Sequence, residues 1–175
     1  MSDQIKYGET YESLAKNISP YLTKTSYKSP YPAWWADTIT VYSKYENPIT
    51  DMITWYRYTI DNCFMQQNSS VLMGNQVQYN TNNIVVRIPQ QDNFKPYAEW
   101  INIPNAEMPN YFTINTGSIV IQGDIEDTID EYTAGKRSTD LLNKYKGLVQ
   151  CITVTSFSDN TGVGRVLPHY RVMGD

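Results

Sequence analysis

The stretch Asp37–Met65, DTITVYSKYENPITDMITWYRYTIDNCFM, decides the fold because it holds two alternating apolar–polar runs separated by a turn. In the first run one side carries Ile39, Val41 and Ser43, and the other carries Thr40, Tyr42 and Lys44. Asn47–Pro48 marks the turn, and the second run, MITWYRYTI, alternates again. The stretch predicts a β-hairpin rich in Tyr and Trp, with no obvious nucleophile, metal ligand or phosphate-binding loop.

More strands are predicted downstream. Residues 69–89 predict two strands around an Asn-rich turn, with Pro89 ending the second. TINTGSIVIQGDIED predicts a strand between Gly117 and Gly123, and LVQCITVTSFSD and VLPHYRVMGD predict a final pair. A short helix is expected before that pair, with Ser138 or Thr139 as N-cap, Gly147 as its end, and Leu141, Leu142 and Tyr145 facing inward. Residues 37–175 are therefore predicted to form a mainly β domain, a small β-barrel or sandwich with one short inserted helix.

The N-terminal part has a different pattern. Residues 9–18 predict a helix, because apolar residues recur on one helical face before Pro20. Residues 19–37 contain Pro20, Pro30 and Pro32, which exclude a regular helix or a central strand. We expect residues 1–36 to form a helix followed by a Pro-rich extended arm. A second Pro-rich segment, residues 90–112, is expected to be a long loop.

Composition excludes several functional classes. The net charge is −4 and the pI is about 5.0, which argues against a general nucleic-acid clamp, since such a clamp needs a basic face. The longest apolar runs are far shorter than the roughly 20 residues of a membrane helix. No apolar signal region begins the chain, so we expect it to be made and kept in the cytosol unless it leaves inside something larger.

The chemistry-bearing residues favour no enzyme, cofactor or metal. His169 has no partner at a usable spacing, and Cys63 and Cys151 lie in apolar runs typical of buried thiols. Residues 124–131 hold five carboxylates but lack the Asp-x-Asp-x-Asp-Gly calcium pattern, so a solvated acidic turn is the favoured interpretation. Catalysis by these carboxylates is the weakest hypothesis.

The 15 Tyr and 4 Trp residues indicate contact surfaces. Aromatic residues within strands, such as Trp55, Tyr58 and Phe157, are interpreted as core or cross-strand partners. Those on the arm and on the 90–112 loop are predicted not to fit inside one small barrel, and they are the candidate interface residues. They are Tyr21, Tyr27, Tyr31, Trp34 and Trp35 on the arm, and Phe94, Tyr97, Trp100 and Tyr111 on the loop.

Residues 38–175 resemble structural proteins of tailed phages and prophages, encoded among the head–tail joining genes. ITVYSKYENPITDMITWYRYTIDNCFM resembles their opening hairpin, and NNIVVRIP their strand ending in Ile–Pro. YFTINTGSIVIQGDIEDTI resembles their segment of aromatic, turn, apolar strand and Gly. STDLLNKYKGLVQCITVTSFSDNTGVGRVLPHYRVMG resembles their late helix, strand and closing hairpin. The chain departs from the pattern at Gly117–Ser118 and Gly147–Leu148, and its N-terminal helix and arm lie outside it.

The resemblance implies a neck component of a siphophage-type virion, most similar to a head-completion (stopper) protein. Such a protein is expected to assemble in the host cytoplasm as a homo-oligomeric ring, six- or twelvefold. Its implied partners are the portal–adaptor complex and tail proteins, with passing contact to genomic DNA and none to a membrane. Closing the head after DNA packaging and docking the tail are its implied roles.

Two alternatives stay open. Another ring of the same assembly, such as a tail terminator, is expected to carry a larger helical layer on its sheet. A carbohydrate-binding β module would instead use exposed Tyr, Trp and Asn side chains to stack on and hydrogen-bond sugars.

Overall fold

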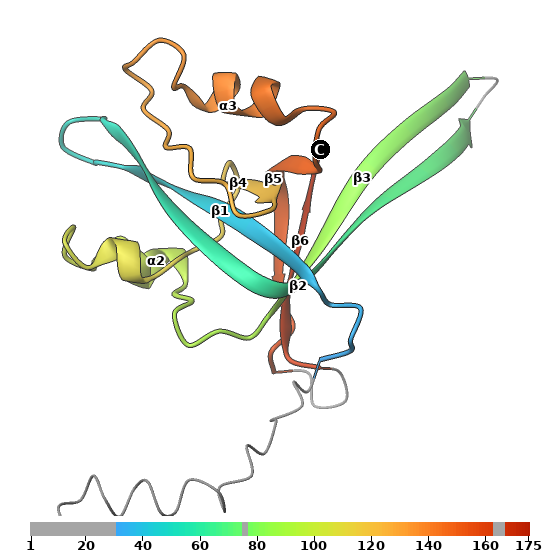
Figure 1. The fold of residues 1–175 in the computed structure, drawn as a ribbon, viewed down its shortest axis with the longest axis horizontal. Helices are drawn as coiled ribbons and strands as arrows, with labels where there is room; N and C mark the ends of the chain where they lie inside the picture. Colours follow the sequence, from blue (N-terminus) through green and yellow to red (C-terminus); the bar gives the residue numbers. More distant parts are fainter. Residues whose placement is uncertain (1–30, 75–76, 163–166) are drawn as a thin grey trace, which may run out of the picture. The chain divides into compact units, whose positions relative to one another are not determined.

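The computed structural model describes residues 31–74, 77–162 and 167–175, with the backbone alone over 68–74 and 77–82 (Figure 1). The predicted helix at 9–18 and the arm residues Tyr21 and Tyr27 lie outside the described residues.

Six antiparallel strands form a closed barrel in the order β1-β2-β3-β6-β5-β4. The strands are β1 Asp37–Glu46, β2 Ile53–Gly74, β3 Val77–Pro89, β4 Ile119–Gln122, β5 Cys151–Asp159 and β6 His169–Gly174. The described helices are short: α2 Tyr97–Trp100, the 3₁₀ turn η1 Met108–Asn110, and α3 Ser138–Tyr145. The chain is thus a mainly β protein built on a small barrel, as its alternating patterns predicted.

Strand β2 changes partner halfway along its length, and this change allows the barrel to close. It pairs with β1 from Ile53 to Cys63 and with β3 from Phe64 to Gly74. At the change, the register with β1 shifts by one extra residue in β2, which is a β-bulge. Asn62 lies in this bulge with φ 59°, and Asn tolerates the left-handed conformation better than most residues.

The side chain of Asp37 fastens the bulge. Its carboxylate accepts a hydrogen bond from the Met65 backbone N–H at 2.9 Å and another from the Gln122 side-chain amide at 3.1 Å. The three residues come from β1, β2 and β4, so one carboxylate joins three strands where β2 turns. Nearby, the Thr38 hydroxyl donates to Asp61 at 2.7 Å.

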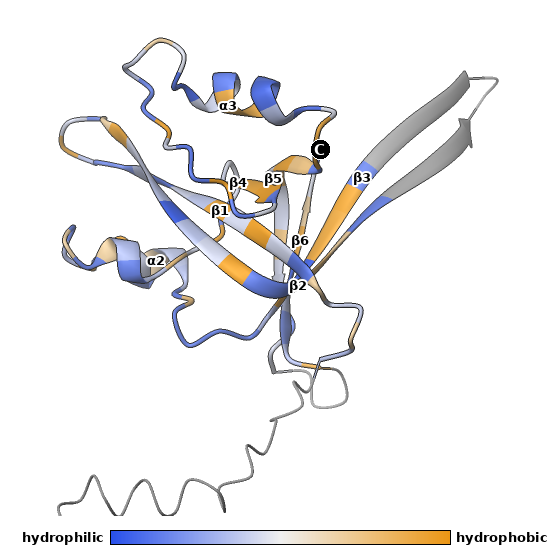
Figure 2. Ribbon diagram, viewed as in Figure 1, coloured by the Kyte–Doolittle hydropathy of each residue, from blue (hydrophilic) through white to orange (hydrophobic). Residues whose placement is uncertain are grey.

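Two hydrophobic clusters lie on opposite faces of the strands. The larger cluster fills the barrel, and Figure 2 shows hydrophobic stretches where the strands converge. It includes Ile39, Val41, Ile60, Val86, Ile88, Phe112, Val120, Ile152 and Val172. The smaller cluster lies beneath α3 and contains Tyr42, Ile119, Ile121, Ile125, Ile129 and Leu141. Both faces of β1 are therefore buried, although its sequence alternates.

Two details of the sequence-based prediction are wrong. The Asn-rich residues 80–83 are not a turn, because they lie within β3 and pair with β2. The 90–112 segment is not a structureless loop, because α2 and η1 interrupt it. The short inserted helix is confirmed as α3, but it begins at Ser138 itself, and the Asp140 carboxylate accepts a hydrogen bond from the Arg137 N–H just before it.

Asn62→Val should lower the free energy of unfolding by about 1–2 kcal/mol, because a β-branched residue is strained at positive φ. Asn62→Gly is the matched control and should retain or exceed the native stability, since the Asn62 side chain is exposed. Urea denaturation measures both. Equal stability of the Val and native proteins would mean that β2 does not need a left-handed residue here.

Gly174→Ala should cost about 1–3 kcal/mol of stability, because a Cβ there would lie 2.2 Å from the Thr153 carbonyl oxygen. Gly162→Ala is the control, because nothing lies within 4 Å of its Cβ position. Thermal unfolding of both variants separates close packing of β6 from a general effect of removing glycine. A Gly174→Ala protein as stable as the control would show that this approach can relax freely.

Candidate functional site

The β1–β2 hairpin extends beyond the barrel and is covered on two faces (Figure 1). On one face, α2 places the fully buried Trp100 against Tyr45 and Tyr56, with ring centroids 6.0 and 5.4 Å apart and edge-on geometry. Tyr97 in turn stacks on Trp100 at 6.3 Å. Aromatic packing of this kind contributes beyond the area it buries, so α2 is held firmly on the hairpin.

The other face is covered by residues 123–132, which we call the acidic strap. The strap follows β4 along β1. Hydrogen bonds from β1 side chains to the strap backbone take the place of a regular backbone ladder here. The Thr40 hydroxyl donates to the Gly123 carbonyl at 2.7 Å and accepts from the Ile125 N–H at 2.9 Å. The Tyr42 hydroxyl donates to the Asp127 carbonyl at 2.7 Å, and burial raises its pKa.

Three of the five strap carboxylates, Asp124, Asp127 and Glu131, bond to neighbouring segments, so the strap is not an isolated solvated turn. Asp124 accepts hydrogen bonds from Arg57 and Thr59 of β2. Glu131 accepts one from the Trp55 indole N–H at 2.9 Å, and the neighbouring Tyr132 hydroxyl accepts one from the Ile53 N–H at 2.9 Å. These bonds, spread along the strap, give its carboxylates a structural role even though the side chains remain largely exposed.

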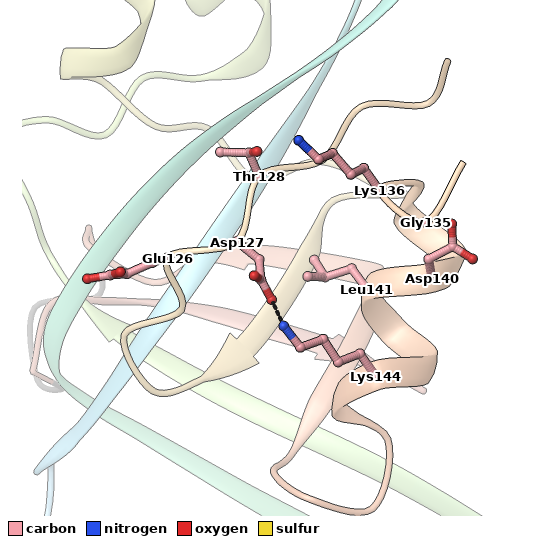
Figure 3. A pocket seen from close by; sticks show the side chains of 8 residues that line it. All are labelled: Glu126, Asp127, Thr128, Gly135, Lys136, Asp140, Leu141 and Lys144. Atoms are coloured by element: carbon pink, nitrogen blue, oxygen red, sulfur yellow. Dashed lines mark hydrogen bonds and ion pairs between the residues drawn. The ribbon is translucent and has the colours of Figure 1, made fainter. Parts of the chain in front are cut away.

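Asp127 joins the strap to α3 (Figure 3). It accepts hydrogen bonds from Lys144 at 2.5 Å and Tyr145 at 2.8 Å, and these bonds lower the pKa of its carboxyl. The same contact raises the pKa values of Lys144 and Tyr145. A cavity of about 350 Å³ opens beside this pair between the strap and α3. It is lined by Glu126, Asp127, Thr128, Gly135, Lys136, Asp140, Leu141 and Lys144.

This cavity contains carboxylates and amines of nearly balanced charge. Asp130 bonds within its own turn, since Thr133 donates to it at 2.6 Å. Within residues 31–74, 77–162 and 167–175, no group of three His, Cys, Asp or Glu side chains is placed to hold a metal ion. The donor pattern fits the attachment of α3 better than it fits a nucleophile and base arranged for catalysis.

The single histidine and both cysteines have structural surroundings. His169 is 7% exposed, packs edge-on against Trp35 at 5.8 Å, and has its Nδ1 2.7 Å from the Leu167 carbonyl. Both cysteines are free; Cys63 is buried, Cys151 is half-buried, and burial raises the pKa of each thiol. These side chains are packing residues of the barrel wall.

The described part of the arm lies on the barrel. Trp35 is only 7% exposed and stacks between Tyr31 and Phe64, with centroids at 5.1 and 6.5 Å. The Tyr31 hydroxyl donates to the Pro168 carbonyl at 2.6 Å. The expectation that Trp35 is a free anchor is therefore wrong, whereas Trp34 is 66% exposed beside a cavity of about 220 Å³. A truncation that tests the arm should end before Tyr31.

The candidate interface residues on the 90–112 loop also divide into buried and exposed side chains. Phe94 packs with Phe112, Phe157 and Tyr170, the nearest centroid being 4.1 Å away, and Trp100 is fully buried. The expectation that these aromatics lie outside the barrel is wrong, because the 90–112 segment folds back onto β1, β2 and β5. Tyr97 is exposed at its rim, and Tyr111 is half-buried with Lys95 over its ring at 5.4 Å.

Of the exposed large apolar side chains, sequence reasoning named Trp34 and Tyr97 as candidate interface residues and included Ile101 in the 90–112 segment, but it did not single out Ile49, Met52, Tyr132 or Leu148. Seven large ones are exposed among the described residues, and five lie on three connected segments at one end of the barrel (Figure 1). We call these five the end surface: Ile49, Met52, Tyr97, Ile101 and Tyr132. The remaining two are Trp34 and Leu148. The sequence feature that could have predicted the end surface is the presence of Ile49 and Met52 in an otherwise polar turn.

Comparison with known proteins identifies the family. Residues 35–175 match the family described as a family of unknown function (DUF6751), and the chain belongs to it. No curated protein and no solved structure matches the chain. The match begins at Trp35, the first residue of the chain that is buried in the barrel among those the structure describes. None of the described helices is long and apolar enough to span a membrane.

Asp127→Asn should lower the urea midpoint slightly at pH 7, because it weakens the bonds from Lys144 and Tyr145. The effect is small since the paired side chains are 57% and 39% exposed and solvent screens them. The pKa of the Asp127 carboxyl is lower in the folded protein than the unfolded value of 3.8, so its ionised form stabilises the fold at pH values above 3.8. This stabilisation is lost as the pH falls through the folded-state pKa.

The difference between the native protein and Asp127→Asn should therefore close below about pH 4. Glu126→Gln, which makes the same charge change on an exposed neighbour, is the control and should leave the midpoint nearly unchanged. A pH-independent difference would mean that the Asp127 charge does not hold α3.

Proposed function

We propose that this protein is a virion structural subunit of a phage neck, a head-completion (stopper) protein that forms a ring between the portal–adaptor complex and the tail. The observation that carries the proposal is the end surface. Exposed apolar side chains grouped at one end of a protein commonly mark contact with another protein. The barrel presents them from the β1–β2 turn, α2 and the strap, which are tied together by Trp100, Trp55 and Tyr132.

The rigidity of this end supports a role in docking. Two independent covers hold the β1–β2 hairpin: α2 through aromatic packing and the strap through hydrogen bonds. A surface that is ordered before binding loses less conformational entropy on association. Ile49 and Met52, 90% and 51% exposed, lie at the tip of a supported hairpin and not on a free loop.

Charge supports the proposed place in the neck. A ring through which DNA passes has to avoid tight phosphate contacts, and such contacts require clustered Lys and Arg. The chain has 14 Lys and Arg against 18 Asp and Glu. Lys144 and Arg57, moreover, are already paired with strap carboxylates.

A stopper is favoured over a tail terminator by the amount of helix. A terminator is expected to carry a broad helical layer on its sheet, whereas α3 has eight residues and α2 has four. The carbohydrate-binding alternative has one observation in its favour. Trp34 lies beside Arg87 at the 220 Å³ cavity, where a sugar ring could stack.

The direct test is the mass of the purified protein, measured alone and with the portal–adaptor complex of the phage or prophage that encodes it. A multi-subunit ring that forms on this complex is the expected result. A protein that stays monomeric beside portal, adaptor and tail proteins would overturn the proposal. Saturable binding in a glycan titration followed by Trp fluorescence would then favour the sugar-binding alternative.

Ile49→Glu should weaken binding of this protein to its axial neighbour at least tenfold, because a charge replaces an exposed apolar contact at the hairpin tip. Thr50→Glu adds the same charge one residue away and should have a smaller effect. Both residues are exposed, so thermal unfolding should stay nearly unchanged in both variants. Equal binding by the Ile49→Glu and Thr50→Glu proteins would exclude the end surface as the contact.

A further inference from the structure

The β2–β3 hairpin continues well beyond the barrel. Pairing of β2 with β1 ends at Cys63, and pairing of β3 with β6 begins only at Ile84. From Asn68 to Gly74, β2 pairs with β3 residues 77–83 and with no other described strand. The strand residues 68–74 and 77–83, which we call the outer hairpin, therefore form a two-stranded ribbon that projects from the barrel (Figure 1).

A ribbon of this kind has two open edges. Each edge presents backbone N–H and C=O groups that no other described strand pairs with. Two-stranded hairpins are at best marginally stable in water without a third strand or a packed face. The outer hairpin thus has both the geometry for strand addition and a thermodynamic reason for it.

Its sequence lacks the features that usually prevent strand addition. No charged residue and no proline occurs between Asn62 and Val86, in a chain in which 18% of residues are charged. Exposed edge strands are normally protected by Lys, by Pro or by bulges that twist the edge away. Here the strands pair in unbroken register from Phe64–Arg87 to Gly74–Val77. The segment is enriched in Asn, Gln and Ser, which tolerate both water and a protein neighbour.

The most suitable partner edge in this chain is the same hairpin of a second copy. Strands β4 and β6 have a neighbour on both sides over most of their length. The parts of β1 and β5 without a second partner, residues 43–46 and 154–159, are shorter than the outer hairpin and carry Lys44, Glu46 and Asp159. Among the described strands, the outer hairpin offers an uncharged edge of matching length on each of its two strands. One edge lies on β2 and the other on β3, so a β2-to-β3 contact between copies can repeat from subunit to subunit.

We propose that the outer hairpins of neighbouring copies pair edge to edge, β2 of one subunit against β3 of the next, and that this contact holds the subunits together laterally. A head-to-tail contact of this type leaves an open edge at each end until the ring closes, and closure satisfies every edge. The inference rests on the proposed ring and names the surface through which the ring forms.

The test is a shortened hairpin. Ser69 and Asn82 face each other in the ladder, so joining them through Asn-Gly removes the outer rungs and keeps a two-residue turn suited to a hairpin. The barrel contacts from Gln67–Ile84 inward are retained. This variant should unfold with the native midpoint but should lose ring formation on the portal–adaptor complex.

A second variant of native length guards against an indirect effect of the deletion. Ser70→Lys with Thr81→Lys places a charge on each strand of one rung. This double variant should weaken assembly at least tenfold, and more strongly at low salt, because neighbouring edges then repel each other. Ser70→Gln with Thr81→Gln is the uncharged control and should assemble normally.

The outcomes separate the two proposals. If the native chain forms no ring with any neck protein, the proposed function fails. If the native ring forms and both the shortened and the Lys variants also form it normally, only the hairpin contact is overturned. Hydrogen exchange tests which chain pairs with the edges of the outer hairpin. The backbone amides of residues 68–83 should become protected in the ring. Protection of these amides by another neck protein without self-association would overturn pairing between copies.

Discussion

The change of partner along β2 is the constraint on which the rest of the structure depends. A single strand of 22 residues cannot stay flat and serve both halves of a small barrel. The bulge at Asn62 turns it from β1 toward β3, and Asp37 satisfies the Met65 N–H at this bend. Closure of the barrel then leaves two hairpins projecting: β1–β2 before the bend and β2–β3 beyond it.

The two hairpins differ in how far other described segments cover them. The β1–β2 hairpin is covered by α2 on one face and by the acidic strap on the other, so both faces of its aromatic sequence are used. The outer β2–β3 hairpin receives no such cover from the described residues and carries no charge. The β1–β2 end is therefore covered on two faces and carries exposed apolar side chains, whereas the β2–β3 end is a hairpin whose outer edges pair with no other described strand. These two ends differ in kind: the first is the proposed axial contact and the second is the proposed lateral one.

The acidic strap shows how polar residues can determine the position of an element. Thr40, Tyr42 and Arg57 on the hairpin reach strap backbone or carboxylate groups, and Lys144 of α3 reaches Asp127. Each exposed ion pair contributes little by itself. The buried Tyr42 hydroxyl is different, because its removal would leave a strap carbonyl without a donor inside the protein.

The sequence alone determined most of the strand pattern, the turns at Asn47–Pro48 and Gly123, the late helix and the mainly β class, whereas tertiary pairing decided that the sheet closes into a barrel. The features that the sequence determined depend on side-chain alternation and backbone preference within a few residues. Tertiary structure decided which aromatics are covered. Trp35 and Trp100 lie in Pro-rich stretches that look exposed, but residues 31–36 and 90–112 fold back onto the barrel. It also decided where β2 ends, because the Asn-rich residues 80–83 favour a turn locally and the β2 ladder outweighs that preference. Local sequence cannot report burial by a segment fifty residues away, and such burial decides which aromatic side chains of this protein stay exposed.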